Sequence, residues 1–369
     1  MVSTMELVLS GAAFLLFLTI LVKGSDLFVK YAADIAKRLG ISEFVIGLTL
    51  VAIGTSLPEL ASSTTASFQH ESGLVVGNIM GSNVANIGLI IGIAATIHYI
   101  KTKEVMLKRD GYFLLFVSFI FYVMVVVMSY TANFHPAINA VVSKVEGVVL
   151  LLTYAVYILF LIHYRHKISK IPHFGDFVKY MLGFKYVNTV KDLVAPPGEE
   201  ETEYESKNKL LDDYPGAAMA RDIIIILVSI AMVVGGAYVV INRAIFFANQ
   251  FDVPKTLVGF TLVAVGTSLP ELSVCIAAAR KGYGEIVLGN VIGSNISNVL
   301  LIGGVASLIY PMATDTTMII FIGPAMVVLS IVLLVFVRSG WKLERWEGIF
   351  FLGAYFLFMV FIFGYNIVL

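Results

Sequence analysis

The six-residue string Gly-Thr-Ser-Leu-Pro-Glu occurs twice, at Gly54–Glu59 and at Gly266–Glu271, each time inside a long apolar stretch. An ionised glutamate at bilayer depth is costly unless a partner or an ion offsets its charge, so each is a candidate functional residue. Proline lacks an amide hydrogen and clashes with the carbonyl four residues earlier, so Pro58 and Pro270 should break their helices near the two glycines. Two carboxylates in duplicated broken helices predict a cation site.

The composition excludes an ordinary soluble globule, because 59% of the 369 residues are hydrophobic and only 14% are charged. The 25 basic and 25 acidic residues balance, so no net field attracts nucleic acid. The lone Cys275 excludes an internal disulfide and a cysteine-based metal site.

Ten apolar stretches are long enough to cross a bilayer. They lie near residues 6–30, 43–68, 74–98, 111–131 and 140–163, and near 219–245, 255–279, 285–309, 317–337 and 346–368. We therefore predict an all-α polytopic membrane protein, with a first five-helix half at 1–163 and a second at 218–369. Between them, residues 164–217 read as a solvated linker that ends in an acidic run.

The two halves are related in sequence. A shift of 212 residues superposes 47–90 on 259–302 without a gap, with about half of the positions identical. Because each half has an odd number of spans, the second must enter the membrane in the opposite orientation. Inverted repeats with broken second and seventh helices predict a substrate site near the bilayer midplane, opened alternately to either side.

Nearly all basic residues of the short loops fall on one side of the ten-span arrangement, and the opposite loops have almost none apart from Arg243 and Lys255. The residues on the basic side are Lys37, Arg38, Lys101, Lys103, Lys108, Arg109, Arg280, Lys281, Arg338, Lys342 and Arg345. The positive-inside rule then places both termini outside and the linker in the cytoplasm.

The broken helices should free backbone carbonyls, from Ala52 or Thr55 in the first half and from Ala264 or Thr267 in the second. A second duplicated string spans 77–83 and 289–295, with Asn86 and Asn298 one turn beyond Ser82 and Ser294. Residues four apart share a helical face, so these hydroxyl and amide oxygens can converge on the carboxylates. Calcium and sodium both prefer such hard oxygen ligands.

Simpler readings exist for several of these residues. The glycines at 77, 81, 289 and 293 suit a close helix-packing face. Asn78 and Asn290 can serve only to bridge helices by hydrogen bonds. An interhelical ion pair for the two glutamates is disfavoured, because no basic residue lies in the apolar part of either broken span or of the spans that follow.

With these strings, the chain resembles the sodium/calcium exchanger family within the cation/calcium antiporters. The resemblance covers both halves and implies four cation positions around the two repeat glutamates. It assigns Glu59 and Glu271 as shared calcium and sodium carboxylates. The carbonyls of Thr55 and Thr267 become calcium ligands, and Ala52, Ser82, Ala264 and Ser294 help form flanking sodium sites. Four further residues line the centre: Ser56, Ser268, Asn86 and Asn298.

The expected function is secondary antiport of calcium against sodium in a cell membrane, without a cofactor or an obligate protein partner. Asn298 stands where potassium-dependent relatives carry aspartate, which argues against potassium co-transport. Proton/calcium antiport through the same glutamates is the alternative within transport, since desolvation raises carboxylate pKa values. A calcium channel and an intramembrane enzyme fit less well: inverted repeats argue against the first, and no His-Glu-x-x-His or Gly-x-Ser-x-Gly string supports the second.

Overall fold

The computed structural model describes residues 4–38, 52–134, 142–164, 173–194, 216–313 and 315–368, nearly all of them helical. In the first half the elements are α1 (Thr4–Arg38), α3 (Ala52–Thr55), α4 (Leu57–Phe68), α5 (Ser72–Ala85), η2 (Asn86–Ile91), α6 (Gly92–Ile97), β1 (Ile100–Lys101), α7 (Glu104–Met106), η3 (Leu107–Gly111), α8 (Tyr112–Phe134) and α9 (Lys144–Tyr164), where η marks a π-helical segment. Helices α10 (Phe174–Leu182) and α11 (Lys185–Val194) follow.

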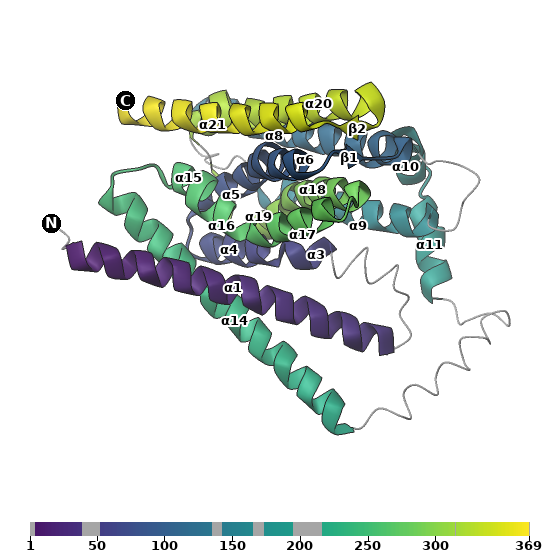
Figure 1. Ribbon diagram of the computed structural model, residues 1–369, viewed down its shortest axis with the longest axis horizontal. Helices are drawn as coiled ribbons and strands as arrows, with labels where there is room; N and C mark the ends of the chain where they lie inside the picture. The colour runs from purple at the N-terminus through teal and green to yellow at the C-terminus, as the bar shows by residue number, and fades with distance from the viewer. Residues whose placement is uncertain are drawn as a thin grey trace.

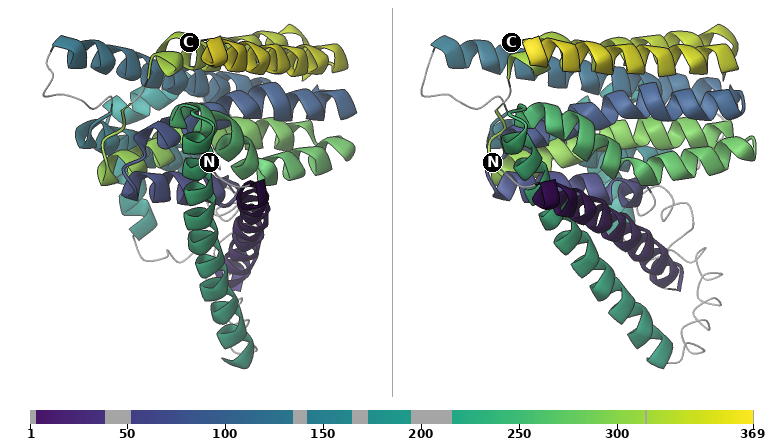
Figure 2. Two further views of the ribbon diagram at one scale, coloured as in Figure 1. Left: turned by 90° about the vertical axis from the view of Figure 1, so that its left-hand side faces the viewer. Right: turned by 60° about the vertical axis from the view of Figure 1, so that its left-hand side comes forward.

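The second half contains α14 (Gly216–Gln250), α15 (Lys255–Val258), η6 (Gly259–Val263), α16 (Ala264–Thr267), α17 (Leu269–Arg280), α18 (Gly284–Ser297), η7 (Asn298–Ile302), α19 (Gly303–Ile309), η8 (Met318–Ile322), α20 (Gly323–Gly340), β2 (Lys342–Leu343) and α21 (Arg345–Val368). Most of these helices run roughly parallel to one another, while α1 and α14 lie together as a slanted pair along one face (Figures 1 and 2).

Eight helices in the described residues are long and apolar enough to cross a membrane, and the bent pair α15–α17 makes a ninth. Two of the predicted spans depart from a single straight helix. The first, predicted at 43–68, is described only from α3 onward, so its beginning lies outside the described residues. The other bends by 46° between Thr267 and Leu269. The predicted breaks before Pro58 and Pro270 are confirmed, since helix α4 begins at Leu57 and α17 at Leu269, each with the proline in its first turn.

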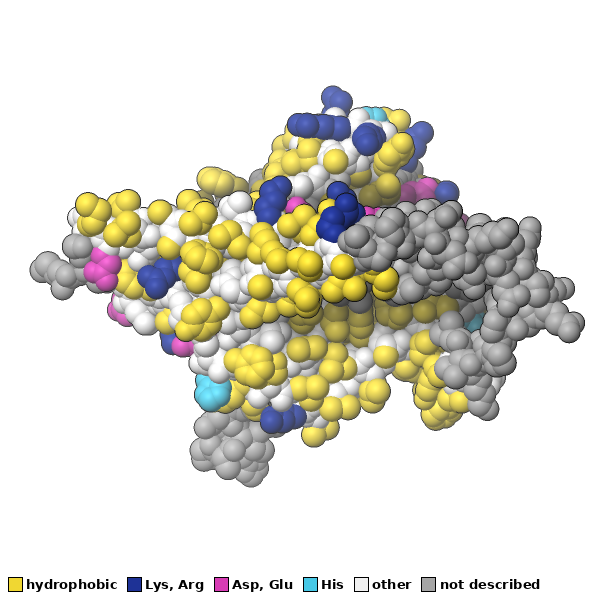
Figure 3. All heavy atoms as spheres, turned by 90° about the horizontal axis from the view of Figure 1, so that it is seen from below, with side chains coloured by type: hydrophobic (Ala, Val, Ile, Leu, Met, Phe, Trp, Pro, Cys, Tyr) yellow, Lys and Arg dark blue, Asp and Glu magenta, His cyan; other side chains and the backbone are white. Residues whose placement is uncertain are grey.

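Burial separates a central helix pair from the outer helices. In the span Ser72–Ile97, 94% of an apolar stretch of 18 residues is buried. In Gly284–Ile309 the corresponding share is 72%. The other spans are 22–44% buried. Large apolar side chains such as Leu15, Ile224 and Leu227 are exposed on the outer helices, and Figure 3 shows this hydrophobic surface on the face seen from below. Outer apolar surface and a buried, more polar centre are what a bilayer solvent requires.

Loops from the two halves contact each other at both ends of the helices. At one end β1 pairs with β2, which brings Lys101 beside Lys342, and Lys103 forms an ion pair of 3.0 Å with Glu285. At the other end the backbone of Val142 pairs with Met312. The first residues of α1 and the last residues of α21 lie at the end away from β1 and β2 (Figure 1). The basic loops at 101–103 and 342 therefore share one end, as predicted.

The linker prediction is wrong for residues 173–194. These residues form α10 and α11, and Phe177 and Tyr180 are buried against Phe160 of α9. Aromatic residues three apart give α10 one apolar face, which packs on the end of α9 instead of remaining solvated. The acidic run at 199–205 lies outside the described residues.

Small residues set the closest helix crossings. A Cβ on Gly77 of α5 would meet the Thr256 carbonyl oxygen at 2.2 Å, and one on Gly81 would meet the Phe260 carbonyl oxygen at 2.6 Å. The packing interpretation is thus confirmed for these two glycines. Gly289 and Gly293 of α18 differ, because a Cβ on either would meet no backbone atom of the described residues within 4 Å.

Candidate cation site

The two repeat glutamates lie at the centre of the helix bundle. Glu59 is in the first turn of α4 and Glu271 in the first turn of α17, and they are 1% and 0% exposed. The breaks after Thr55 and Thr267 create these helix N-termini inside the protein, where the helix dipole favours negative charge. The position of each carboxylate therefore follows from the duplicated Ser-Leu-Pro-Glu sequence.

Each carboxylate accepts a hydrogen bond from the serine of the other motif. Ser268 Oγ donates to Glu59 Oε1 at 2.9 Å, and Ser56 Oγ donates to Glu271 Oε1 at 3.2 Å. Ser294 Oγ donates to the same Glu271 oxygen at 3.2 Å. The two broken helices are thus joined by reciprocal contacts, although more than 200 residues separate them in sequence.

Several buried oxygens in this region have no hydrogen-bond partner within the described part of the chain. They are Glu59 Oε2, Glu271 Oε2, Ser82 Oγ, Asn86 Oδ1 and Asn298 Oδ1. Buried polar atoms are normally satisfied, so a group of unpartnered acceptors needs an explanation. Among the described residues, no Lys or Arg pairs with either glutamate, which argues against the interhelical ion pair.

The candidate residues are not all equivalent across the two motifs. Ser294 bonds to Glu271, whereas Ser82, its counterpart, leaves its hydroxyl unpartnered among the described residues. Thr267 Oγ1 donates to the Val263 carbonyl at 3.0 Å, so its side chain supports the helix end. Thr55 ends α3 and is half-buried, and Ala264 begins α16 and is fully buried. Ala52 is the first residue of α3. The roles of these backbone carbonyls as ligands stay predictions.

Four asparagines join the two halves beside the carboxylates. Asn86 Nδ2 donates to Asn295 Oδ1 at 2.8 Å, and Asn298 Nδ2 donates to Asn83 Oδ1 at 3.0 Å. The side-chain amides of Asn83 and Asn295 each donate to the other's backbone carbonyl at 3.3 Å. We call these four residues the asparagine quartet. Asn83 and Asn295 were not singled out from the sequence, although the repeated Gly-Ser-Asn string contains both of them.

The first of the two Gly-Asn asparagines has a structural role. Asn78 Nδ2 donates to Ser63 Oγ at 2.9 Å and to the Glu59 carbonyl at 3.4 Å, which ties α5 to α4. Its Oδ1 lies 3.3 Å from Thr267 Oγ1. Asn290, the counterpart, contacts Cys275 Sγ at 3.5 Å instead and lines a cavity of about 320 Å³.

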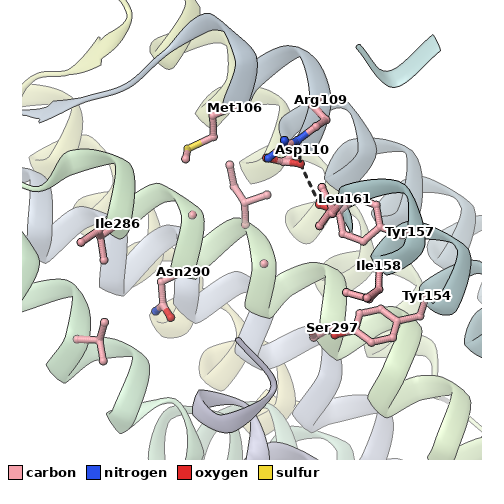
Figure 4. Close-up of a pocket in the computed structure, with 14 residues that line it drawn as sticks. Met106, Arg109, Asp110, Tyr154, Tyr157, Ile158, Leu161, Ile286, Asn290 and Ser297 are labelled. Carbon is pink, nitrogen blue, oxygen red and sulfur yellow. Dashed lines mark hydrogen bonds and ion pairs between the residues drawn. The ribbon is translucent and has the colours of Figure 1, made fainter. Parts of the chain in front are cut away.

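This cavity lies between α9, α17, α18 and the short segments α7 and η3 (Figure 4). At its wall Arg109 makes two bonds to Asp110, and Tyr157 donates to Asp110 Oδ1 at 2.9 Å. The Tyr154 hydroxyl lies 3.1 Å from Ser297 Oγ. Only its position next to Arg109 in a basic loop could have marked Asp110 from the sequence.

Charged residues are sparse around the centre. In the described ranges no three residues among His, Cys, Asp and Glu come together as a potential metal cluster. The site therefore offers two carboxylates surrounded by hydroxyl and amide oxygens. Such a set suits hard cations and offers no imidazole or thiolate for a transition metal.

Comparison with known proteins assigns the chain to a family. A family profile described as sodium/calcium exchanger protein matches residues 9–163 and 222–364. The chain belongs to the sodium/calcium exchanger family. Members of this family are membrane transporters and not enzymes.

Individual relatives span nearly the whole chain. Sodium/calcium exchanger MaX1 of Methanosarcina acetivorans is 45% identical over 95% of this chain and 97% of its own length. An uncharacterized membrane protein of Methanocaldococcus jannaschii is 34% identical over 95% and 96%, respectively. Solved structures of the sodium-calcium exchanger NCX_Mj, soaked with sodium and strontium, are similar with a TM-score of 0.53 at 31% identity. They cover 95% of this chain and 97% of theirs.

Proposed function

We propose that this protein is a secondary antiporter that exchanges calcium for sodium across a cell membrane by alternating access. Both ions compete for one cluster around Glu59 and Glu271. The observation that carries this proposal is the free, buried Oε2 atom of each carboxylate, next to the unpartnered oxygens of Ser82, Asn86 and Asn298. A cation bound there would satisfy acceptors for which the described residues supply no donor.

Charge balance gives the proposed coupling. Two ionised glutamates in a low-dielectric centre carry two uncompensated negative charges, so rearrangement of the empty protein is costly. One calcium ion or several sodium ions remove that penalty. The cluster then switches between facing outside and facing inside only when it is filled with ions. This is the condition for exchange without leak.

The remaining ligands are assigned by position. We propose that the Thr55 and Thr267 carbonyls join the glutamates at the calcium position. Ala52, Ser82, Ala264 and Ser294 would then flank it at sodium positions. Ser56 and Ser268 lie at the centre, and their hydroxyls already bond to the carboxylates.

The arrangement of the chain supports inverted repeats of five helices each. In α4 the chain runs toward the end where Glu71 meets Lys255, and in α17 it runs away from that end toward Glu285. The equivalent motifs therefore enter the centre from opposite ends. Helices α1 and α14 pack on each other and carry none of the candidate ligands, so we propose that they are the elements that move.

The test is calcium uptake into proteoliposomes loaded with sodium. Matched vesicles contain sodium on both sides, and a third set carries an imposed pH gradient without a sodium gradient. Uptake driven by the sodium gradient alone is expected. Uptake driven by the pH gradient alone would show that protons, and not sodium ions, are exchanged for calcium. Uptake without either gradient would indicate a channel.

A further inference from the structure

The asparagine quartet contains two kinds of residue. Asn86 and Asn298 begin the π-helical segments η2 and η7, and their Oδ1 atoms have no partner among the described residues. Asn83 and Asn295 lie one turn earlier, and their Oδ1 atoms each accept a bond from the opposite half. All four side chains are at most 1% exposed.

A carboxamide presents a donor at one end and an acceptor at the other. Asn83 Oδ1 holds the Nδ2 end of Asn298, and Asn295 Oδ1 holds the Nδ2 end of Asn86. With the nitrogen held, only the carbonyl oxygen of Asn86 or Asn298 remains available. A flipped carboxamide would place an N–H group there and repel a cation.

We propose that Asn83 and Asn295 are positioning residues for cation binding. They act through Asn298 and Asn86, whose carboxamides they hold with the oxygen free to contact the ion. This inference rests on the proposed function. It adds two neutral oxygens to the site without adding charge, so the cluster keeps the two negative charges of the glutamates.

The pairing crosses between the halves. Asn83 of α5 positions Asn298 of the second half, and Asn295 of α18 positions Asn86 of the first. The amides of Asn83 and Asn295 also bond to each other's backbone at 3.3 Å, and Asn83 Nδ2 contacts Met326 Sδ at 3.6 Å. The acceptor end of Asn83 therefore serves Asn298, while its donor end serves packing, and substitutions can separate the two roles.

The test is a double-mutant cycle, read out as the calcium concentration that half-saturates exchange and as the calcium-induced shift in unfolding temperature. Asn83→Ala should raise the half-saturating calcium concentration roughly tenfold. A loss of this size corresponds to the free energy of about one hydrogen bond, here the bond that holds Asn298. In an Asn298→Ala background the same change should have an effect of less than about twofold. Asn83 does not position Asn86, so in an Asn86→Ala background the effect of Asn83→Ala should again be roughly tenfold.

Equal effects of Asn83→Ala in both backgrounds would overturn the proposal, because the residue would then act on the fold as a whole. If Asn83→Ala does not fold, Asn83→Asp keeps the volume and the acceptor for Asn298, but it loses the donor and adds a buried carboxylate. Half-saturation no weaker than in the unchanged protein is expected for Asn83→Asp, and a marked weakening would contradict the positioning role.

The equivalent cycle with Asn295→Ala in Asn86→Ala and Asn298→Ala backgrounds should give the mirror result, with the small effect in the Asn86→Ala background. Absence of any calcium-induced shift in the unchanged protein would refute the proposed function itself. A normal shift with equal effects in both cycles would refute only the role of the two asparagines.

Discussion

At the scale of single residues, the reciprocal bonds between motifs place two carboxylates in one buried volume. We expect Glu59→Gln and Glu271→Gln each to reduce sodium-driven calcium uptake at least about 100-fold, because each removes one of the two charges that a divalent cation must meet. The unfolding temperature without ions should not fall, since a buried charge is removed. Glu285→Gln, on an exposed residue, is the control and should keep normal uptake. Normal uptake by either central variant would refute the site assignment.

The serine donors allow a finer test. Ser268→Ala removes the 2.9 Å bond to Glu59, and we expect roughly a tenfold weaker apparent calcium affinity with an unchanged fold. Ser273→Ala is the matched control on α17, because Ser273 is exposed and, in the part of the chain that the structure describes, its hydroxyl bonds only to the Leu269 carbonyl. The measurement is the calcium concentration that half-saturates uptake into proteoliposomes, compared between the two variants. Equal values would mean that the bond from Ser268 to Glu59 has no part in calcium binding.

At the scale of the elements, α5 and α18 share most of their motif but pack differently. We expect Gly77→Ala to destabilise the protein by about 1–3 kcal/mol, because its Cβ would overlap the Thr256 carbonyl of α15. Gly289→Ala, at the equivalent position of α18, should be neutral or stabilising by about 0.5–1 kcal/mol, since its Cβ would approach only the flexible end of Met106, at 3.6 Å, within the described residues. Thermal unfolding measures both, and equal losses would contradict the difference in packing.

At the scale of the whole molecule, the contacts of the loops define two ends. With Cys275→Ser as background, Lys342→Cys should react with a membrane-impermeant thiol reagent from the cytoplasmic side, and Asp252→Cys from the outside. Both positions are exposed in the structure, whereas Cys275 is 0% exposed. Labelling of intact cells and of inverted vesicles checks the assignment, and reaction of both residues from one side would overturn the ten-span topology.

Much of this protein could be predicted from its sequence, because a bilayer leaves few alternatives. Apolar runs of about 20 residues must be helices, and proline within them must break the backbone hydrogen bonding. The breaks before Pro58 and Pro270 and the burial of the two glutamates therefore followed from local chemistry. The helices α10 and α11 did not, because the aromatic face of α10 is stabilised by packing on α9 and on Phe113 and Phe116 of α8.

The sequence by itself determined the helical membrane architecture, the duplicated broken helices and the residue types of the candidate cation site. Only the tertiary structure decided which side chains meet. The bond from Ser56 to Glu271 and the pairing of Asn83 with Asn298 each join residues 215 positions apart. The physical reason is that helix periodicity fixes which residues share a face, whereas the partner of that face depends on how the two halves pack together.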